Sequence, residues 1–346
     1  MTVDRLFQVQ RHERLLTQLR SCGAVRVREL ARDLGVSELT IRRDIAALAA
    51  RNLVTRVHGG ATLPATSPRR PRPAPAAGFP IGMVVPSLDF YWPPIVAGAR
   101  AAAAALGVTI QLRGSSYDPD EDRRQIGRLV EEQQVRGLLL APNLDGPGAD
   151  EMLDWIGGLP VPAVLVERQP RRWSPAARRI EWVRSDHTLG MEMAVHHLRE
   201  QGHDRIGLML SGGSPTSAYL RKGGNGIDDL LVPGEPEAAV RACRAGVTAL
   251  IVHSDPDAIA VVSACHEAGL DVPGDLAVVA YDDEIAHLAQ PALTAVRPPK
   301  HHVGRVAVEL MVARLQSGDR RPPQGVLLTP ELLVRESSLL FRKVRV

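Results

Sequence analysis

The chain has 346 residues, of which 45% are hydrophobic and 23% are charged. This composition is typical of a globular protein, and the length allows two or three domains. No run of roughly 18 apolar residues predicts a membrane span, and the N-terminus is polar where a signal peptide would be apolar. We therefore expect a cytoplasmic protein. Cys22, Cys243 and Cys265 are odd in number and widely spaced, which excludes a disulfide framework or a cysteine-based zinc site.

The formal net charge of +3 conceals an asymmetry between the two ends of the chain. Residues 1–72 contain fourteen arginines and six acidic residues, a net charge of +8. The remainder contains 28 basic and 33 acidic residues, a net charge of −5. A basic head on an acidic body is typical of a nucleic-acid-binding module joined to a sensor domain.

The first 63 residues predict a small helical domain that ends in a hairpin. Apolar spacing predicts a helix over residues 8–22, a short strand over 25–27, and helices over 28–34 and 37–51. Residues 53–63 predict a hairpin that turns at Gly59 and Gly60. Residues 64–80 contain six prolines, so we expect an extended linker there.

The two helices after residue 28 form a predicted helix-turn-helix. Ala31 allows the helices to approach closely, Gly35 suits a turn with positive φ, and Ser37 suits the N-cap of the second helix. Ile41, Ile45 and Leu48 would then be buried on one face of that helix. The opposite face is polar, and we expect it to contact operator DNA in the major groove through Ser37, Glu38, Thr40, Arg42 and Arg43. From the hairpin we expect Arg56 and His58 to contact the phosphate backbone.

Two segments of this head resemble the N-terminal domain of the DeoR family of bacterial regulators. They are Ser37-Glu38-Leu39-Thr40-Ile41-Arg42-Arg43-Asp44 and Leu53-Val54-Thr55-Arg56-Val57-His58-Gly59-Gly60-Ala61. The resemblance covers roughly residues 5–63. It implies a winged helix-turn-helix that binds DNA through the helix carrying Thr40, Arg42 and Arg43.

The body after the linker alternates apolar strands with helices. The predicted strands are Ile81–Val85, Val108–Leu112, Gly137–Ala141, Ala163–Val166, Arg205–Leu210, Ala249–Val252 and Ala277–Tyr281. The predicted helices include Ile95–Leu106, Arg123–Gln133, Gly190–Glu200 and Pro256–Ala268. Such alternation predicts an α/β fold with parallel sheets that helices cover on both faces.

The body resembles the effector domain of the LacI and GalR family, which shares its fold with periplasmic sugar-binding proteins. The residues that carry the resemblance are Ile81–Ser87, Asp186, Gly190, His197–Leu198, Gly202–Ile206, Val272–Asp283 and Pro291–Thr294. The resemblance implies a two-lobed, periplasmic-binding-protein-like domain over 81–338, followed by a tail over 339–346. No LacI-type hinge helix is recognisable, and the Pro-rich linker takes its place.

In that family a sugar binds between the lobes, near the carboxyl ends of the strands. By resemblance and position, the expected effector-binding residues are Tyr91, Trp92, Glu167, Arg221, Asp255 and Asp282. Aromatic rings would stack on the sugar, and carboxylates would accept its hydroxyls. Each residue also has a purely structural interpretation: core packing for the aromatics and a helix N-cap for Asp282.

One segment departs from the family pattern. Only 34 positions separate Arg221 from Asp255, and Lys222-Gly223-Gly224-Asn225-Gly226 lies between them. Glycine weakens a helix, so we expect a short or frayed helix at Arg221. We also expect a trimmed C-terminal lobe that lacks one strand, which leaves ligand binding open.

The sequence gives no strong signal for a metal site or for catalysis. His196, His197 and His203, and likewise His301 and His302, lack carboxylates at chelating spacing, so no metal or cofactor is expected. We find no nucleophile–histidine arrangement, so we expect no enzyme. The leading hypothesis is a homodimeric repressor that binds double-stranded operator DNA and responds to a sugar. The alternatives are a ligand-insensitive DNA-binding dimer and a sugar-processing enzyme fused to a DNA-binding head.

Overall fold

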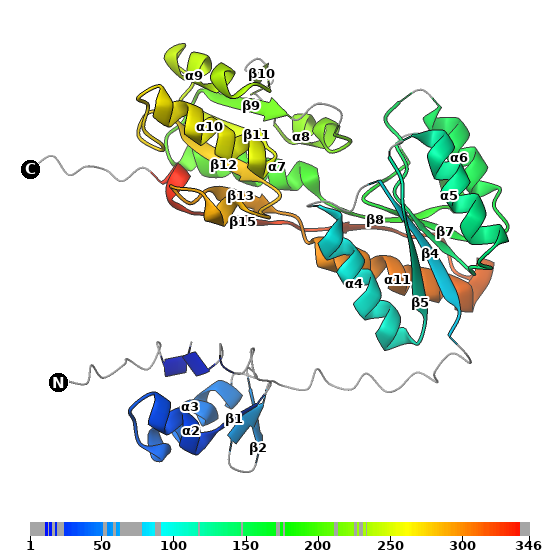
Figure 1. The fold of residues 1–346 in the computed structure, drawn as a ribbon, viewed down its shortest axis with the longest axis horizontal. Helices are drawn as coiled ribbons and strands as arrows, with labels where there is room; N and C mark the ends of the chain where they lie inside the picture. The colour runs from blue at the N-terminus through cyan, green and yellow to red at the C-terminus, as the bar shows by residue number, and fades with distance from the viewer. Residues whose placement is uncertain are drawn as a thin grey trace, which may run out of the picture. The chain divides into compact units, whose positions relative to one another are not determined.

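The structure is a computed structural model, shown in Figure 1. It describes residues 11–12, 14–15, 18, 24–50, 54–57, 60–62, 78–86, 91–116, 118–146, 148–170, 174–175, 177–210, 214–224, 227, 231–232 and 234–339. The chain divides into two compact units, residues 1–74 and 75–346. This division falls inside the predicted linker. Among the described residues, no helix is long and apolar enough to cross a membrane.

The first unit is a winged helix-turn-helix. Its elements are β1 (Ala24–Arg26), α2 (Val27–Asp33), α3 (Glu38–Ala50), β2 (Thr55–Val57) and β3 (Gly60–Thr62). The three strands form one antiparallel sheet in the order β1-β3-β2. Of the predicted first helix, residues 11–12, 14–15 and 18 are described, and they are helical.

The turn between α2 and α3 depends on Gly35, whose φ of 63° is in the left-handed region that favours glycine. The Val36 amide donates to the Ala31 carbonyl at 3.0 Å, which closes the turn. The buried residues of this unit are Leu15, Val25, Val27, Leu30, Ala31, Ile41, Ile45, Leu48, Val54 and Ala61. The apolar face expected of the second helix is therefore the face that the head buries.

The second unit has two α/β lobes. The N-terminal lobe contains β4 (Pro80–Val85), α4 (Trp92–Leu106), β5 (Thr109–Gly114), α5 (Pro119–Glu131), β6 (Leu138–Leu140), α6 (Ala149–Gly157), β7 (Ala163–Val166), η1 (Ala177–Arg179), β8 (Glu181–Ser185), α11 (Lys300–Ser317), η4 (Gly318–Arg320) and β14 (Gly325–Leu328). Its sheet has the order β14-β8-β7-β6-β4-β5, with every pair parallel.

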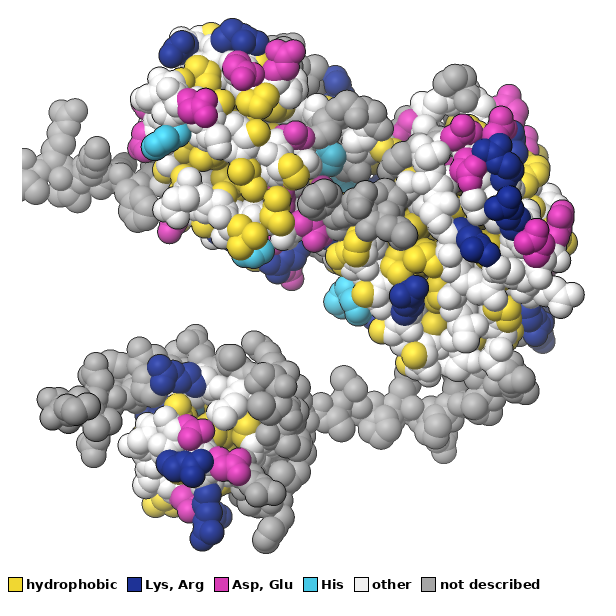
Figure 2. Space-filling model, in the orientation of Figure 1, with side chains coloured by type: hydrophobic (Ala, Val, Ile, Leu, Met, Phe, Trp, Pro, Cys, Tyr) yellow, Lys and Arg dark blue, Asp and Glu magenta, His cyan; other side chains and the backbone are white. Residues whose placement is uncertain are grey.

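Helices cover both faces of this sheet, which explains why its central strands β4, β6 and β7 are almost continuously apolar. Ile81, Met83 and Val85 of β4 join the core formed with α4 and α11. Val84, which points to the other face, joins the core formed with α5 and α6. Figure 2 shows basic and acidic side chains together on the outer surface over α5 and α6.

The C-terminal lobe contains α7 (His187–Glu200), β9 (Ile206–Leu210), α8 (Ser217–Gly223), β10 (Leu231–Val232), α9 (Pro236–Arg244), β11 (Ala249–His253), α10 (Asp255–Glu267), β12 (Ala277–Tyr281), η3 (Ala286–Leu288), β13 (Thr294–Arg297), β15 (Glu331–Leu333) and η5 (Glu336–Ser338). Its sheet has the order β10-β9-β11-β12-β13-β15. The pair β13–β15 is antiparallel and the others are parallel.

The expectation that this lobe lacks a strand is wrong. β10 is present beside β9, although it has only two residues, which pair with Leu208 and Met209. The helix at Arg221 is short, as expected, and ends after seven residues at Gly223. The shortened segment therefore trims the edge of the sheet without removing a strand.

The chain crosses between the lobes three times, from β8 to α7, from β13 to α11, and from β14 to β15 (Figure 1). Helices α4 and α11 pack closely in the N-terminal lobe through two glycines. A Cβ at Gly98 would lie 2.0 Å from the His301 carbonyl oxygen, and one at Gly304 would lie 1.9 Å from that of Ile95. No residue larger than glycine fits at either position without separating the helices.

Candidate DNA-binding surface and interlobe site

The N-terminus of α3 is capped as the sequence predicts. The Thr40 amide donates to Ser37 Oγ at 3.2 Å, and the Ser37 and Thr40 hydroxyl oxygens are 2.9 Å apart. Ser37 is exposed and Thr40 is half-buried. Both side chains thus lie at the start of the helix, where backbone N–H groups and the helix dipole favour a DNA phosphate.

The other expected DNA-binding residues of α3 are also accessible. Glu38 accepts from Arg28 Nε at 3.3 Å and from Arg42 Nη2 at 3.4 Å. The Arg42 side chain is 61% exposed, and Arg43 is exposed as well. On the face of the head seen in Figure 2, basic and acidic side chains stand side by side. Because exposed ion pairs are weak, these arginines are free to exchange Glu38 for DNA.

Sequence reasoning missed two residues of this helix. Leu39, next to the cap, is 58% exposed, an unusual environment for a large apolar side chain that suits contact with a thymine methyl group. Asp44 is 3% exposed and accepts from Arg11 Nε at 2.8 Å and from Arg11 Nη2 at 3.2 Å. Its Oδ1 also lies 3.1 Å from His12 Nε2. Asp44 therefore fixes α3 to the preceding helical segment.

The two wing residues cannot be placed as fully. The backbone of Arg56 lies in β2, where it pairs with Ala61, but its side chain lies outside the described residues. His58 lies outside them altogether. Their contact with the phosphate backbone remains a prediction.

Five polar residues from both lobes meet at the carboxyl ends of the strands, and we call them the interlobe cluster: Tyr91, Glu167, Ser185, His187 and Tyr281. The Tyr91 hydroxyl donates to Glu167 Oε1 at 3.0 Å, and the Ser185 hydroxyl donates to the same oxygen at 2.8 Å. Glu167 Oε2 accepts from the Ser185 amide at 3.0 Å and lies 3.4 Å from His187 Nε2. His187 Nδ1 lies 3.1 Å from the Tyr281 hydroxyl. Glu167 and Ser185 belong to the N-terminal lobe, whereas His187 and Tyr281 belong to the other.

The electrostatics of the cluster favour an ionised Glu167. Burial alone would raise the pKa of its carboxyl, but hydrogen bonding and charge interaction with His187, together with the bonds from Ser185, outweigh burial and lower that pKa. Burial raises the pKa of Tyr91 and of Tyr281 well above the usual range, and nearby carboxylates raise both further. Both phenols therefore stay protonated and can donate hydrogen bonds.

Asp282 follows the cluster at the end of β12. Its φ of 104° is rare for an aspartate, and its side chain is 13% exposed. Oδ2 lies 3.7 Å from His253 Nε2, whereas Oδ1 has no hydrogen-bond partner among the described residues. Lys300 Nζ donates to the Asp282 carbonyl oxygen at 2.5 Å, pairs with Glu284, and lies 5.1 Å from the centre of the Tyr91 ring.

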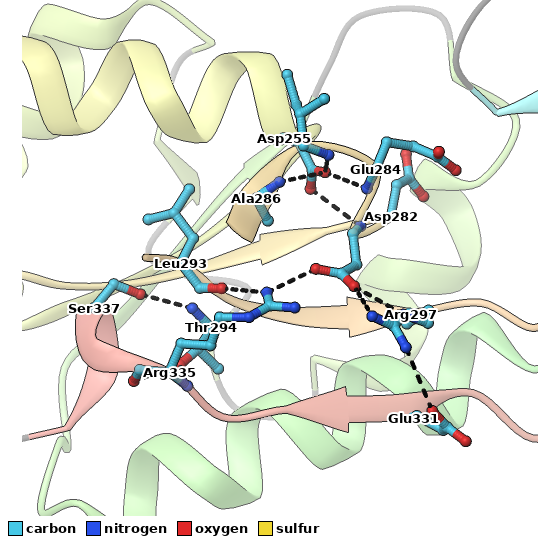
Figure 3. A network of polar contacts seen from close by, with 12 residues as sticks. Asp255, Asp282, Glu284, Ala286, Leu293, Thr294, Arg297, Glu331, Arg335 and Ser337 are labelled. Atoms are coloured by element: carbon cyan, nitrogen blue, oxygen red, sulfur yellow. Dashed lines mark hydrogen bonds and ion pairs between the residues drawn. The ribbon is translucent and has the colours of Figure 1, made fainter. Parts of the chain in front are cut away.

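Asp255 is an anchor for a loop, not an open ligand contact. Its carboxylate is 1% exposed and accepts four backbone amides of the loop after β12, as Figure 3 shows. The donors are Asp283 at 3.2 Å, Glu284 at 2.6 Å, Ile285 at 2.9 Å and Ala286 at 3.2 Å. Because both oxygens already accept backbone amides, this geometry favours a positioning role for Asp255, and its contact with an effector remains a prediction.

The neighbouring Asp283 is also structural. Its carboxylate accepts from Arg297 Nε at 2.8 Å and from Arg335 Nη1 at 2.7 Å; these two arginines are labelled in Figure 3. With Asp255 it holds the loop that presents Asp282 and Glu284.

Trp92 and Arg221, the two remaining residues expected to bind an effector, have different environments. Trp92 is 3% exposed and packs in the N-terminal core, because the first turn of α4 faces the sheet; this environment favours the core interpretation. Arg221 is exposed on α8. On the same helix, Tyr219 lies under the guanidinium of Arg184, 4.2 Å from its ring centre, so this pair links the lobes. Among the described residues, no group of three or more His, Cys, Asp or Glu is placed to hold a metal ion.

Comparisons with known proteins agree with this division. Residues 11–67 match the DeoR-like helix-turn-helix domain, and residues 195–338 match the periplasmic binding protein-like domain. An uncharacterised HTH-type transcriptional regulator in the aml 5′ region of Streptomyces limosus is 29% identical over 347 residues, covering 90% of this chain and 94% of that protein. The ribose operon repressor of Escherichia coli K12 is 26% identical over 278 residues, covering 75% and 82%.

A solved structure, that of the transcriptional regulator CelR in complex with cellobiose, is similar over 87% of this chain and 90% of its own. The TM-score is 0.63 and the sequence identity is 25%. The chain is a DNA-binding transcriptional regulator in which a DeoR-like helix-turn-helix domain precedes a two-lobed, periplasmic-binding-protein-like domain.

Proposed function

We propose that the chain is a homodimeric bacterial repressor in the cytoplasm, whose affinity for operator DNA is controlled by a sugar bound between its lobes. No catalytic step is assigned to it. The ribose operon repressor and the CelR–cellobiose complex bear names that support a repressor and a sugar effector. The observation that carries the proposal is the interlobe cluster beside Asp282 Oδ1, a solvent-shielded carboxylate oxygen that has no hydrogen-bond partner among the described residues.

For DNA, the proposal assigns base contacts to Arg42, Arg43 and Leu39, and phosphate contacts to the capped start of α3. The buried face of α3 leaves these side chains outward, as a recognition helix requires. Replacing Arg43 by alanine should weaken operator binding by about 1–3 kcal/mol if it contacts a base. The matched control is Arg199→Ala, which removes an exposed arginine from α7.

This experiment has two stages. Duplexes retained by the full chain from a random library define the operator, and fluorescence anisotropy at several salt concentrations then gives affinity and salt slope for each variant. Unchanged affinity and slope in Arg43→Ala would remove it from the interface. Failure of the wild-type chain to bind any duplex at low salt would overturn the DNA-binding assignment itself.

For the effector, the site offers both hydrogen-bonding characters that a sugar requires. Asp282 Oδ1 is shielded from solvent and lacks a partner among the described residues, and Arg221, assigned to the site by family resemblance, has an exposed guanidinium on α8. Charge-assisted bonds from such groups to hydroxyls are the strong ones. The half-buried aromatic ring of Tyr91, whose centre lies 5.1 Å from Lys300 Nζ, offers a face for the apolar side of a sugar.

The interlobe cluster also offers a route by which sugar binding would change the affinity of the N-terminal head for DNA. Glu167 and His187 belong to different lobes and lie 3.4 Å apart, so a ligand that enters between the lobes changes which interlobe contacts persist. An effector shifts DNA affinity only if it binds one arrangement of the lobes more tightly than the other. Two heads on one dimer would then contact two half-sites of an operator. Sedimentation equilibrium of the full chain tests the dimer.

Calorimetry with ribose, cellobiose and glucose, using the full chain, tests the effector. Asp282→Asn should weaken binding of the active sugar by roughly ten- to a hundredfold, since a charged hydrogen bond contributes about 1.5–3 kcal/mol. Operator binding without sugar should not change. The control is the exposed Asp204→Asn. Equal affinity in Asp282→Asn and wild type would exclude that carboxylate from the site.

A second candidate is a ligand-insensitive DNA-binding dimer. It is favoured by one observation: both oxygens of Glu167 already have partners within the chain. Intact operator binding, together with no calorimetric response to any sugar, would support this candidate over the sugar-controlled repressor.

A further inference from the structure

A hollow lies in the N-terminal lobe at the amino ends of its strands, whereas the interlobe cluster lies at their carboxyl ends. Its volume is about 960 Å³, and its walls come from the starts of β7 and β8, the ends of α6 and α11, and η1 and η4. β8 joins the two regions, because Glu181 at its start lines the hollow and Ser185 at its end belongs to the interlobe cluster. The hollow is therefore separate from the proposed sugar site.

The lining carries an excess of positive charge. Four arginines, Arg178, Arg179, Arg314 and Arg321, face two carboxylates, Glu181 and Asp319. The helices α6 and α11 end here, and each carboxyl end contributes roughly half a negative charge. The wall remains net positive after these contributions, so it attracts anions.

In the buried part of this wall, Arg314 Nη1 donates to the Gly318 and Arg321 carbonyl oxygens, and Arg321 Nη2 to that of Leu310, but one nitrogen of each arginine is left over. Glu181 is 1% exposed and accepts from Arg314 Nε at 3.0 Å and from Arg321. One carboxylate thus balances two guanidinium groups. Arg314 Nη2 and Arg321 Nε are shielded from solvent and have no hydrogen-bond partner among the described residues. Buried guanidinium N–H groups normally have an acceptor, and here the described part of the chain does not supply one.

The rest of the lining limits the size and character of the ligand. Ile156, Leu159, Val161 and Leu315 contribute apolar surface, and the volume is in the range of small-molecule sites. Arg178 and Arg179 on η1 are exposed at the rim. Arginine forks match the geometry of phosphate oxygens. A phosphate group with a short carbon skeleton suits this combination.

We propose that this hollow binds a small phosphorylated metabolite, making the protein a regulator with two ligand sites. The phosphate is held by Arg178 and Arg179 at the rim, with Arg314 and Arg321 behind them, and the carbon skeleton lies on the apolar wall. This site does not depend on sugar binding between the lobes. A ligand in the hollow lies beside the start of β8, the strand whose end carries Ser185.

Thermal shift and calorimetry of the full chain with inorganic phosphate and with glucose 6-phosphate test the proposal, with sodium chloride at matched ionic strength. The test variant is Arg178→Ser/Arg179→Ser, which leaves the buried pairs of Glu181 in place. The control, Arg199→Ser/Arg244→Ser, removes the same charge from exposed positions of the other lobe. We expect saturable binding that weakens roughly ten- to a hundredfold in the test variant only.

Three outcomes would overturn the proposal. The first is the absence of saturable phosphate binding by the wild-type chain. The second is equal affinity in the test variant. The third is that free phosphates do not bind while the test variant loses affinity and salt slope on a non-specific duplex, since the arginines would then serve the DNA backbone. Operator binding by the test variant, measured without phosphate, separates this result from failure of the repressor assignment.

Discussion

Replacing Asp255 tests whether this carboxylate anchors a loop or touches the effector. Its four backbone donors lie 2.6–3.2 Å away, and the side chain is almost fully buried. Alanine would leave these amides without an acceptor, each at a cost of about 1 kcal/mol. Removing a buried charge recovers part of this cost, since burial raises the pKa of Asp255. We expect Asp255→Ala to lower the free energy of unfolding by about 3 kcal/mol.

Asparagine refines the test because it keeps the shape and one acceptor oxygen. Placed where Oδ2 lies, that oxygen still accepts from Glu284, Ile285 and Ala286. The amide nitrogen then faces the Asp283 N–H, and one bond is lost. We expect Asp255→Asn to lose about 1–2 kcal/mol. The matched control on the same helix is Asp257→Ala, which removes one half of the capping box with Ser254 and should lose about 1 kcal/mol.

Urea unfolding of the full chain gives these free energies, and calorimetry with the active sugar gives the effector affinity of each variant. If Asp255 anchors the loop, the free energy of unfolding is highest in the wild type, lower in Asp257→Ala and Asp255→Asn, and lowest in Asp255→Ala. Sugar binding is then retained in Asp255→Asn. The reasoning is refuted if Asp255→Ala stays within about 0.5 kcal/mol of wild type while sugar binding disappears. Asp255 would then be a direct ligand contact.

Three other predictions concern stability. Asp44→Ala should destabilise the head by about 3 kcal/mol, because Arg11 loses its buried carboxylate; a loss below about 0.5 kcal/mol in urea would contradict this. Gly304→Ala should cost about 2 kcal/mol by separating α4 from α11, whereas Gly127→Ala, with open space around it, should be neutral or stabilising. The melting temperature should fall as the pH falls through about 6.5, since burial lowers the pKa of three histidines and the unfolded chain then binds more protons; a rise would contradict it. They are His197, His203 and His253.

The elements predicted well are those with a strong local signal. Seven apolar strands of the body occur where expected, because all except the edge strand β5 consist almost entirely of buried residues. The sequence predicts helix starts that lie later than those in the structure. α4 begins at Trp92, not Ile95, because Pro93 and Pro94 are compatible with the first turn of a helix. The strands missed, among them β8 and β14, are short or polar. Glu181 and Arg184 in β8 are buried only because distant arginines and Gln169 satisfy them.

The site was harder to predict than the fold because its contacts join distant parts of the chain. His187 and Tyr281 lie 94 positions apart yet contact each other, and nothing local to either residue indicates this. Asp255 shows the opposite difficulty. A carboxylate after an apolar strand has the same sequence pattern whether it faces a ligand or the amides of a folded loop. Only the position of residues 283–286 distinguishes the two.

The triple crossing between the lobes limits how they can move. Two bodies joined by one peptide segment would have wide rotational freedom, but three segments side by side leave little more than bending about a single axis. One of those segments begins at Ser185 of the interlobe cluster, and another ends at Lys300, which donates to the Asp282 carbonyl oxygen. A bend there would displace His187 from Glu167 or Lys300 from Asp282. The segments that connect the lobes are therefore the places where contacts must change when one lobe rotates relative to the other.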